Sequence, residues 1–459
     1  MKRLFKFAGL ALLVIFLIVI GFLAVTFPPI MAGMAAKTMC SCVFVSQRSP
    51  QSVRDKELKV FPGLSGASID VHEQERTVEA HILWKTSKAI YRDGLGCTLL
   101  SERSEAEVRA QSTNLPDAPL AQDTVAWPQG DLISRRESGI DTVKLHAAID
   151  EAFAEPDPGH PKNTSAVVVI YDGQLVAEQY GENIERDSRL MGWSMTKSIT
   201  NALTGLLVKS GKLMLDSPAP VEEWQNDKRA TITLSELLQA SSGLEWAESY
   251  FESTSHFHRM FIRRDDKAAY AASLPLKHDP GTYFQYSSGT TNILSRIIRQ
   301  TVGNDSYYRF PYDSLFYRIG MNHAIMEPDA SGTFVGSSYS YASARDWARF
   351  GLLYLNDGIW NGRRILPEGW VKYTVTPGSA APIGEYGAQW HLNAGAPGNP
   401  ALRKFPGLPV DAFWADGFEE QWILVIPSHK LVLVRLGVSH HGFSIEKLAN
   451  EVIASVSGN

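Results

Sequence analysis

The sequence contains only three cysteines in 459 residues, which are too few for a framework of disulfides. No Cys-x-x-Cys spacing accompanies them, so we expect no zinc site, and nothing in the sequence indicates another metal or a cofactor. A glycine period and low-complexity tracts are also missing, which excludes fibrous proteins. Basic residues are in deficit, with 44 Lys and Arg against 49 Asp and Glu, a formal net charge of −5 that argues against a nucleic-acid partner.

The overall composition is typical of a folded globular protein. Hydrophobic residues make up 44% of the chain and charged residues 20%, a balance that supports a large buried core rather than disorder. At about 150 residues per domain, the length allows two or three structural units.

A long apolar run lies near the amino terminus. Lys2, Arg3 and Lys6 precede the uncharged run Phe7–Phe27, which has the length of about 20 residues that a membrane helix needs. The apolar part of a cleaved signal peptide is shorter, roughly 7–15 residues, so we favour an uncleaved signal anchor at 1–29 over a cleaved signal. Because positive charges stay in the cytoplasm, the rest of the chain is expected on the outer, periplasmic side of the inner membrane.

The three cysteines fit that oxidising compartment. One disulfide and one free thiol is the simplest arrangement, and we expect Cys97 to pair with either Cys40 or Cys42.

Three further regions follow the predicted anchor. Residues 30–100 contain short runs of β-branched and aromatic residues between turn signals, which predict a small β-rich region. Residues 101–164 are rich in proline and predict a linker with one helix, Asp141–Phe153. Residues 165–459 carry the strongest patterns and are expected to form a catalytic domain.

The order of patterns in that domain predicts its fold class. A β-hairpin turns at Asp172-Gly173, a helix runs from Ser194 to about Ser210, and residues 215–370 are mostly helical in pattern. Strands return at 422–426 and 431–436, and an amphipathic helix closes the chain. We therefore expect an α/β (α+β) fold, in which an antiparallel sheet is flanked by helices and carries an inserted helical lobe.

A Ser-x-x-Lys motif marks the candidate nucleophile. In Ser194-Met-Thr-Lys197 the two side chains share one face of a helix, so Lys197 can take the proton that makes Ser194 a nucleophile. The motif is short, and a second match occurs at Ser444-Ile-Glu-Lys447. Context favours Ser194, which begins an apolar-faced helix after the hairpin, whereas little chain follows Ser444 to supply partners.

Several segments beyond this motif make the chain resemble the serine β-lactamase-like hydrolases. This family contains class C β-lactamases, D,D-peptidases and esterases, and the 6-aminohexanoate-dimer hydrolases are the most similar group within it. The segments that carry the resemblance are Trp193–Ser198, Ile232–Trp246, Phe284–Ser288, Gly336–Tyr339 with Ala344–Gly351, and Gly417–Gln421.

The resemblance implies specific roles for individual residues. It places the nucleophile on Ser194, the lysine base on Lys197 and the second-motif tyrosine on Tyr286, which would exchange protons with the nucleophile and the leaving group. It also implies an oxyanion hole made by two backbone N–H groups, one from Ser194 and one from the strand near Phe418 and Glu419.

The chain departs from the lactamase pattern at two places. Ser288 stands where the lactamase motif has Asn, and Gly417-Phe-Glu-Glu-Gln421 stands where lactamases have Lys-Thr-Gly. No cation is offered there to a β-lactam carboxylate, and Glu419 and Glu420 would repel one. This favours a hydrolase of esters or small amides, with a D,D-peptidase or β-lactamase, or a non-catalytic sensor or scaffold, as alternatives.

The resemblance also indicates substrate contacts. Trp246 falls where amide-hydrolysing relatives carry an aromatic side chain that closes over the substrate, and Ser337 and Tyr339 lie in a stretch that adjoins the cleft. The expected partners are a small ester or amide substrate and, through the anchor, a membrane. The sequence leaves the oligomeric state open.

Overall fold

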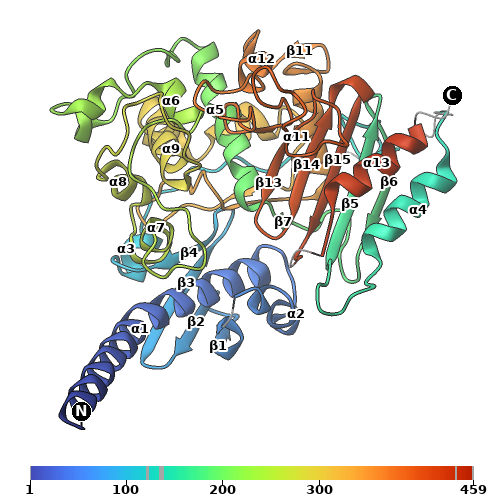
Figure 1. The fold of residues 1–459 in the computed structure, drawn as a ribbon. Helices are drawn as coiled ribbons and strands as arrows, with labels where there is room; N and C mark the ends of the chain where they lie inside the picture. The colour runs from blue at the N-terminus through green and yellow to red at the C-terminus, as the bar shows by residue number, and fades with distance from the viewer. Residues whose placement is uncertain (1, 62, 120–122, 134–138, 440–441, 457–459) are drawn as a thin grey trace.

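The computed structural model of the chain describes residues 2–61, 63–119, 123–133, 139–439 and 442–456. A six-stranded antiparallel sheet has helices on both faces, a helical lobe lies beside it, and a long N-terminal helix packs below with a small sheet (Figure 1). This arrangement confirms the expected α/β class with an antiparallel sheet flanked by helices.

The large sheet is assembled from both ends of the catalytic domain. Its strand order is β12-β13-β14-β15-β5-β6, and every neighbouring pair is antiparallel. The predicted hairpin turn at Asp172-Gly173 joins β5 to β6, and both turn residues have positive φ, as a tight hairpin turn requires. The strands are β5 (Thr164–Tyr171), β6 (Gln174–Tyr180), β12 (His391–Leu392), β13 (Phe413–Gly417), β14 (Gln421–Ile426) and β15 (Leu431–Gly437).

Alternation along the strands sends apolar side chains to both faces of this sheet. Val168 and Ile170 of β5 pack in the core that contains α11 (Ala344–Leu355), whereas Val167 and Val169 pack in a second core with α4 (Thr142–Phe153) and α13 (Ile445–Val456). Because both faces are covered, the central strands β5, β14 and β15 are almost wholly buried and mostly apolar.

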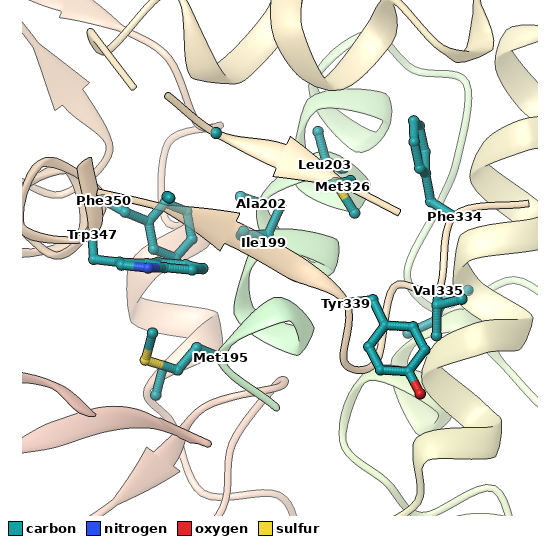
Figure 2. Close-up of a cluster of buried hydrophobic side chains, with 14 of the residues drawn as sticks. Met195, Ile199, Ala202, Leu203, Met326, Phe334, Val335, Tyr339, Trp347 and Phe350 are labelled. Carbon is teal, nitrogen blue, oxygen red and sulfur yellow. The ribbon is translucent and has the colours of Figure 1, made fainter. Parts of the chain in front are cut away.

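The helical lobe lies between β6 and β12 in the sequence. Its central helix, α5 (Thr196–Lys209), is almost entirely buried, and Figure 2 shows Ile199, Ala202 and Leu203 of this helix among aromatic and aliphatic side chains from elsewhere in the domain. The other helices of the lobe are α6 (Leu234–Leu238), α7 (His256–Arg263), α8 (Lys267–Ala272), α9 (Ser288–Val302) and α10 (Asn304–Tyr307).

Short elements complete the domain. A three-stranded sheet of order β7-β9-β8 lies next to the start of α5. The two-stranded hairpin β10-β11 and the helix α12 follow α11 in the chain. Their bounds are β7 (Leu190–Met191), β8 (Ile325–Met326), β9 (Ser340–Ala342), β10 (Ile359–Trp360), β11 (Arg363–Arg364) and α12 (Trp370–Thr374).

The N-terminal region combines one long helix with the expected small sheet. The sheet has the order β1-β2-β3-β4 and lies within the segment 30–100 that was expected to be rich in strands. The elements are α1 (Lys2–Phe44), α2 (Pro50–Asp55), β1 (Ser68–His72), β2 (Thr77–Ile82), β3 (Lys85–Arg92), β4 (Gly96–Leu100) and α3 (Glu105–Arg109).

Two helices differ from the sequence expectation. The first helix continues through Pro28 and Pro29 to Phe44, although strands were expected from residue 30; the Ala- and Met-rich run Met31–Met39 favours helix and explains the extension. The segment 101–164 contains α3 as well as the predicted α4, because Ser104 and Glu107 form a capping box that starts a short helix.

The second half of α1 is packed into the protein, while its first half projects away from the body (Figure 1). Cys40 of α1 forms a disulfide with Cys97 of β4, which is one of the two pairings expected, and Cys42 is a buried free thiol. Across the described parts of the chain, no helix has both the length and the apolar character needed to span a membrane.

Candidate active site

Ser194 lies on a tight turn between β7 and α5. Residues Trp193–Met195 form a 3-10 turn, so Ser194 precedes the α-helix that was expected to begin with it. Trp193 has a φ of 46°, a strained conformation that non-glycine residues adopt mainly where the surrounding structure imposes it. Gly192 allows the turn to pack against Trp347, because a Cβ atom there would lie 2.5 Å from the indole ring.

Lys197 is directed at Ser194 from the first turn of α5. Its Nζ lies 3.1 Å from Ser194 Oγ, 3.1 Å from Ser288 Oγ and 3.0 Å from the backbone carbonyl oxygen of Ser337. Burial lowers the pKa of Lys197 to about 8, an effect that the nearby Glu248 opposes. The lysine therefore reaches its neutral form close to neutral pH, next to the hydroxyl that it would deprotonate.

Ser288 connects Lys197 to a carboxylate that the sequence analysis missed. Its hydroxyl donates to Glu248 Oε1 at 2.6 Å and its backbone N–H to Glu248 Oε2 at 2.9 Å. The indole N–H of Trp246 also donates to Glu248. The residue that replaces the lactamase Asn thus retains a contact with the lysine and anchors a negative charge behind it.

Two tyrosines, Tyr286 and Tyr250, lie close to Lys197 and Ser194. The ammonium of Lys197 lies 4.7 Å from the ring centroid of Tyr286, so the lysine contacts the face of that ring. Tyr250 lines the same cavity as Ser194, and its hydroxyl is 3.4 Å from Glu248 Oε1. Burial raises the pKa of both tyrosines well above the usual value, so both are neutral phenols that can donate a proton.

Glu248 and Tyr250 lie in an irregular loop, where no periodic pattern singles out a residue. The one available signal was their position directly after Trp246, at the end of a segment that carries the family resemblance.

The end of β13 closes the other side of the site. A Cβ atom on Gly417 would lie 2.2 Å from the carbonyl oxygen of Gly192 and 3.0 Å from Trp193 Cβ, so only glycine allows this approach. Phe418 follows, with its ring packed edge-on against Trp193 at 5.6 Å between centroids. The backbone at Phe418 is thereby brought beside the turn that holds Ser194, and its role as the second oxyanion donor stays a prediction.

The side chains of Glu419 and Glu420, which follow Phe418, lie in different surroundings. Both have left-handed φ angles, 67° and 66°. Glu419 lines a cavity beside the one that contains Ser194, and burial, reinforced by the adjacent Glu420, raises its pKa to about 8. The Glu420 carboxylate accepts a hydrogen bond of 2.9 Å from the Trp422 indole. In the described structure neither side chain lines the cavity that contains Ser194.

A second carboxylate, that of Asp416, lies near Lys197. Asp416 of β13 pairs with His391 of β12 at 3.0 Å. Burial alone would raise the pKa of Asp416, but His391, Lys404 and Lys197 together hold it well below its usual range. Asp416 thus adds a second fixed negative charge to the surroundings of Lys197.

The other predicted site residues, Tyr339, Ser337 and Trp246, lie at different places around Ser194 and Lys197. Tyr339 lines the cavity that contains Ser194, whereas Ser337 lies behind Lys197 and accepts its hydrogen bond. Trp246 is buried against Gly289 and holds Glu248; it is not among the described residues that line that cavity, and its predicted role over the substrate stays untested.

The second Ser-x-x-Lys match has no comparable surroundings. Ser444 caps the start of α13 by accepting the N–H of Lys447, and the Lys447 ammonium pairs with Glu151 at the surface. Among the described residues, no cluster of His, Cys, Asp or Glu side chains is arranged to hold a metal ion.

Comparisons with known proteins identify the family of the chain. The sequence model of the beta-lactamase family matches residues 152–457. A 6-aminohexanoate-dimer hydrolase of Paenarthrobacter ureafaciens is 26% identical over 261 residues, a match that covers 51% of this chain and 66% of the relative, just under two thirds of its length.

Solved structures share the fold. A Bacillus anthracis protein assigned as a 6-aminohexanoate-dimer hydrolase is 25% identical with a TM-score of 0.53, over 64% of this chain and 79% of that one. EstCE1, a hydrolase with promiscuous acyltransferase activity, has a TM-score of 0.55 at 14% identity, over 69% of this chain and 98% of that one. Because the family model matches more than half of the length of this chain, the chain belongs to the beta-lactamase family and is a serine hydrolase of that family.

Proposed function

We propose that the chain hydrolyses esters or small amides through an acyl-enzyme formed on Ser194. The observation that carries the proposal is the position of Lys197, whose Nζ lies 3.1 Å from Ser194 Oγ and whose pKa is lowered to about 8 by burial. A serine hydroxyl becomes a nucleophile when a positioned base removes its proton, and a buried lysine with this pKa is such a base near neutral pH.

The proposed reaction has two halves. Neutral Lys197 accepts the Ser194 proton as the oxygen attacks the substrate carbonyl, and the backbone N–H groups of Ser194 and Phe418 stabilise the negative charge on the carbonyl oxygen. A neutral phenol, that of Tyr250 or Tyr286, donates a proton to the leaving alcohol or amine. The Lys197 ammonium then returns a proton to that phenolate, which restores both groups. Water attacks the acyl-enzyme and gives a proton to neutral Lys197, which passes it to Ser194 Oγ as the carboxylic acid leaves.

Charge around the site favours esters and small amides over β-lactams. The segment Gly417–Gln421 supplies no cation for a β-lactam carboxylate. The related protein of Paenarthrobacter ureafaciens is named as a hydrolase of the 6-aminohexanoate dimer, which supports a small substrate here. Turnover of nitrocefin would favour the β-lactamase alternative instead.

Covalent labelling tests the proposal directly. A fluorophosphonate probe should give one adduct, mapped by mass spectrometry to Ser194, and hydrolysis of p-nitrophenyl acetate should be lost in Ser194→Ala. Ser444→Ala is the matched control and should behave as the unmodified chain does. An adduct on Ser444, or no adduct on folded protein, would contradict the assignment, and the latter would favour a sensor or scaffold.

We also propose that Phe7–Phe27 holds the chain at the inner membrane, with the hydrolase domain on the outer side. The support is the apolar run behind Lys2, Arg3 and Lys6, together with the Cys40–Cys97 disulfide, which suits an oxidising compartment. Protease added to spheroplasts should digest the hydrolase domain, and alkaline carbonate should leave the chain with the membranes. Protection from protease would contradict the orientation.

A further inference from the structure

The cavity that contains Ser194, here called the Ser194 cavity, is walled by apolar and aromatic side chains. It is lined by Trp193, Phe261, Ile262, Tyr339 and Phe418 among others. Lys37 is the only charged residue among the described residues that line it. Its ammonium is already paired with Glu327, hydrogen-bonded to Ser41 Oγ at 2.9 Å, and placed 3.9 Å above the Tyr339 ring.

Part of this wall comes from outside the matched hydrolase domain. Met34, Lys37 and Thr38 of α1 line the Ser194 cavity, as does Phe61, although the family match begins only at residue 152. Met34 and Thr38 also line the neighbouring cavity that Glu419 borders, so both cavities lie beneath the same stretch of α1. The N-terminal helix is therefore part of the site as well as part of the scaffold.

A row of aromatic rings leads from the surface towards Ser194. Phe251 is 74% exposed, and its ring centroid lies 5.6 Å from that of Phe61. The Phe61 ring stacks on Phe418 at 5.4 Å, and Phe418 contacts Trp193, the residue directly before Ser194. A third cavity, lined by Phe27, Ile30, Met31 and Phe251, shares Phe61 and Tyr250 with the Ser194 cavity.

Such a wall is chemically suited to a hydrocarbon group. Apolar surface gains free energy when it leaves water, while a charged or strongly polar group placed here would lose hydration without a free partner. We infer that the substrate carries a hydrocarbon acyl chain, that this chain occupies the Ser194 cavity, and that Met34 and Thr38 of α1 set how much of it is accepted. This inference rests on the proposed acyl-enzyme mechanism and names the substrate class of the same site.

A chain-length series tests the inference. The probes are p-nitrophenyl acetate, butyrate and octanoate, assayed with the full-length chain in lipid nanodiscs so that detergent does not enter the cavity. Each methylene group that leaves water on binding raises kcat/KM by about fourfold. Octanoate has six more methylene groups than acetate, and burial of only two of them would raise kcat/KM by more than roughly tenfold, which is the smallest gain we expect.

Variants of α1 test the contribution of that helix. Met34→Trp fills the cavity and should lower the ratio of octanoate to acetate kcat/KM by roughly tenfold. Met214→Trp makes the same change on an exposed methionine that lines none of the described cavities, and should leave the ratio unchanged. Thr38→Leu repeats the test if thermal melting shows that Met34→Trp does not fold.

The outcomes separate this inference from the proposed function. Hydrolysis of acetate with no gain towards octanoate would overturn the hydrocarbon inference and leave the serine mechanism standing. A gain that Met34→Trp and Thr38→Leu both leave intact would overturn the role of α1. Failure to hydrolyse any of the esters, together with no fluorophosphonate adduct, would overturn the proposed function and the inference with it.

Discussion

Lys37 of α1 and Glu327, which follows β8, form an ion pair that is buried inside the protein. The Glu327 carboxylate also accepts hydrogen bonds from Ser41 Oγ at 2.8 Å and from the backbone N–H of Cys97 at 2.7 Å. One carboxylate of the hydrolase domain thus ties down both the N-terminal helix and β4, next to the Cys40–Cys97 disulfide. This connection holds α1 over the Ser194 cavity.

Removing one partner of this pair should be strongly destabilising. Lys37→Met leaves the Glu327 charge buried without its cation, and the free energy of unfolding should fall by about 3–5 kcal/mol. Urea denaturation followed by tryptophan fluorescence measures the change. The control is Lys447→Met: the Lys447 side chain is 55% exposed, so this substitution should cost about 0–1 kcal/mol. Equal losses in the two variants would contradict the role given to the Lys37–Glu327 pair.

The pH dependence should report the protonation of Lys197. Its pKa is lowered from 10.5 to about 8, so the side chain is protonated and inactive as a base below that pH and neutral above it. Consequently kcat/KM should rise with pH and level off above about 8. Lys197→Ala should lose about a hundredfold or more in kcat. Tyr286→Phe should keep the rising limb, and loss of the limb in that variant would make the tyrosine the titrating group.

Local patterns predicted much of the fold and the centre of the site. The Asp172-Gly173 hairpin has its own turn signal, and the spacing of Ser194 and Lys197 is itself a local pattern, so neither depends on distant parts of the chain. Lys37 and Glu327 are 290 residues apart and carry no such pattern, and only the tertiary fold pairs them. For the same reason the position of α1 over the site could not be foreseen.

The pKa shifts at the site could not be predicted from the sequence either. Whether Lys197 or Tyr286 gives up a proton more readily depends on burial, which lowers the pKa of a lysine and raises that of a tyrosine. Glu248 is one of many acidic residues in the chain, and only the folded loop brings it to Ser288.

Neutralising Glu248 should move the pH profile in a defined direction. The negative charge of Glu248 favours the protonated form of Lys197 and so opposes the lowering of its pKa. Glu248→Gln removes that charge, so the pKa of Lys197 should fall further and the rising limb of kcat/KM should move to lower pH. Glu252→Gln, in an exposed part of the same loop, is the control and should leave the limb in place. A shift to higher pH in Glu248→Gln would show that another group titrates.

Catalysis should also depend on the close approach of β13 to the turn that holds Ser194. In Gly417→Ala the new methyl group would meet the Gly192 carbonyl oxygen at 2.2 Å and Trp193 Cβ at 3.0 Å, so β13 must move away from Ser194. The backbone N–H of Phe418 would move with it, and loss of one oxyanion donor lowers kcat by about a hundredfold.

The matched control for this last change is Gly66→Ala, because a Cβ atom on Gly66 meets nothing within 4 Å. Circular dichroism should show both variants folded, and steady-state kinetics on p-nitrophenyl acetate should place the Gly417→Ala defect in kcat rather than in KM. That split is expected because the oxyanion contact forms only as charge develops on the carbonyl oxygen. A defect confined to KM would mean that this end of β13 binds the substrate without stabilising the transition state, and the second donor would then have to come from another element.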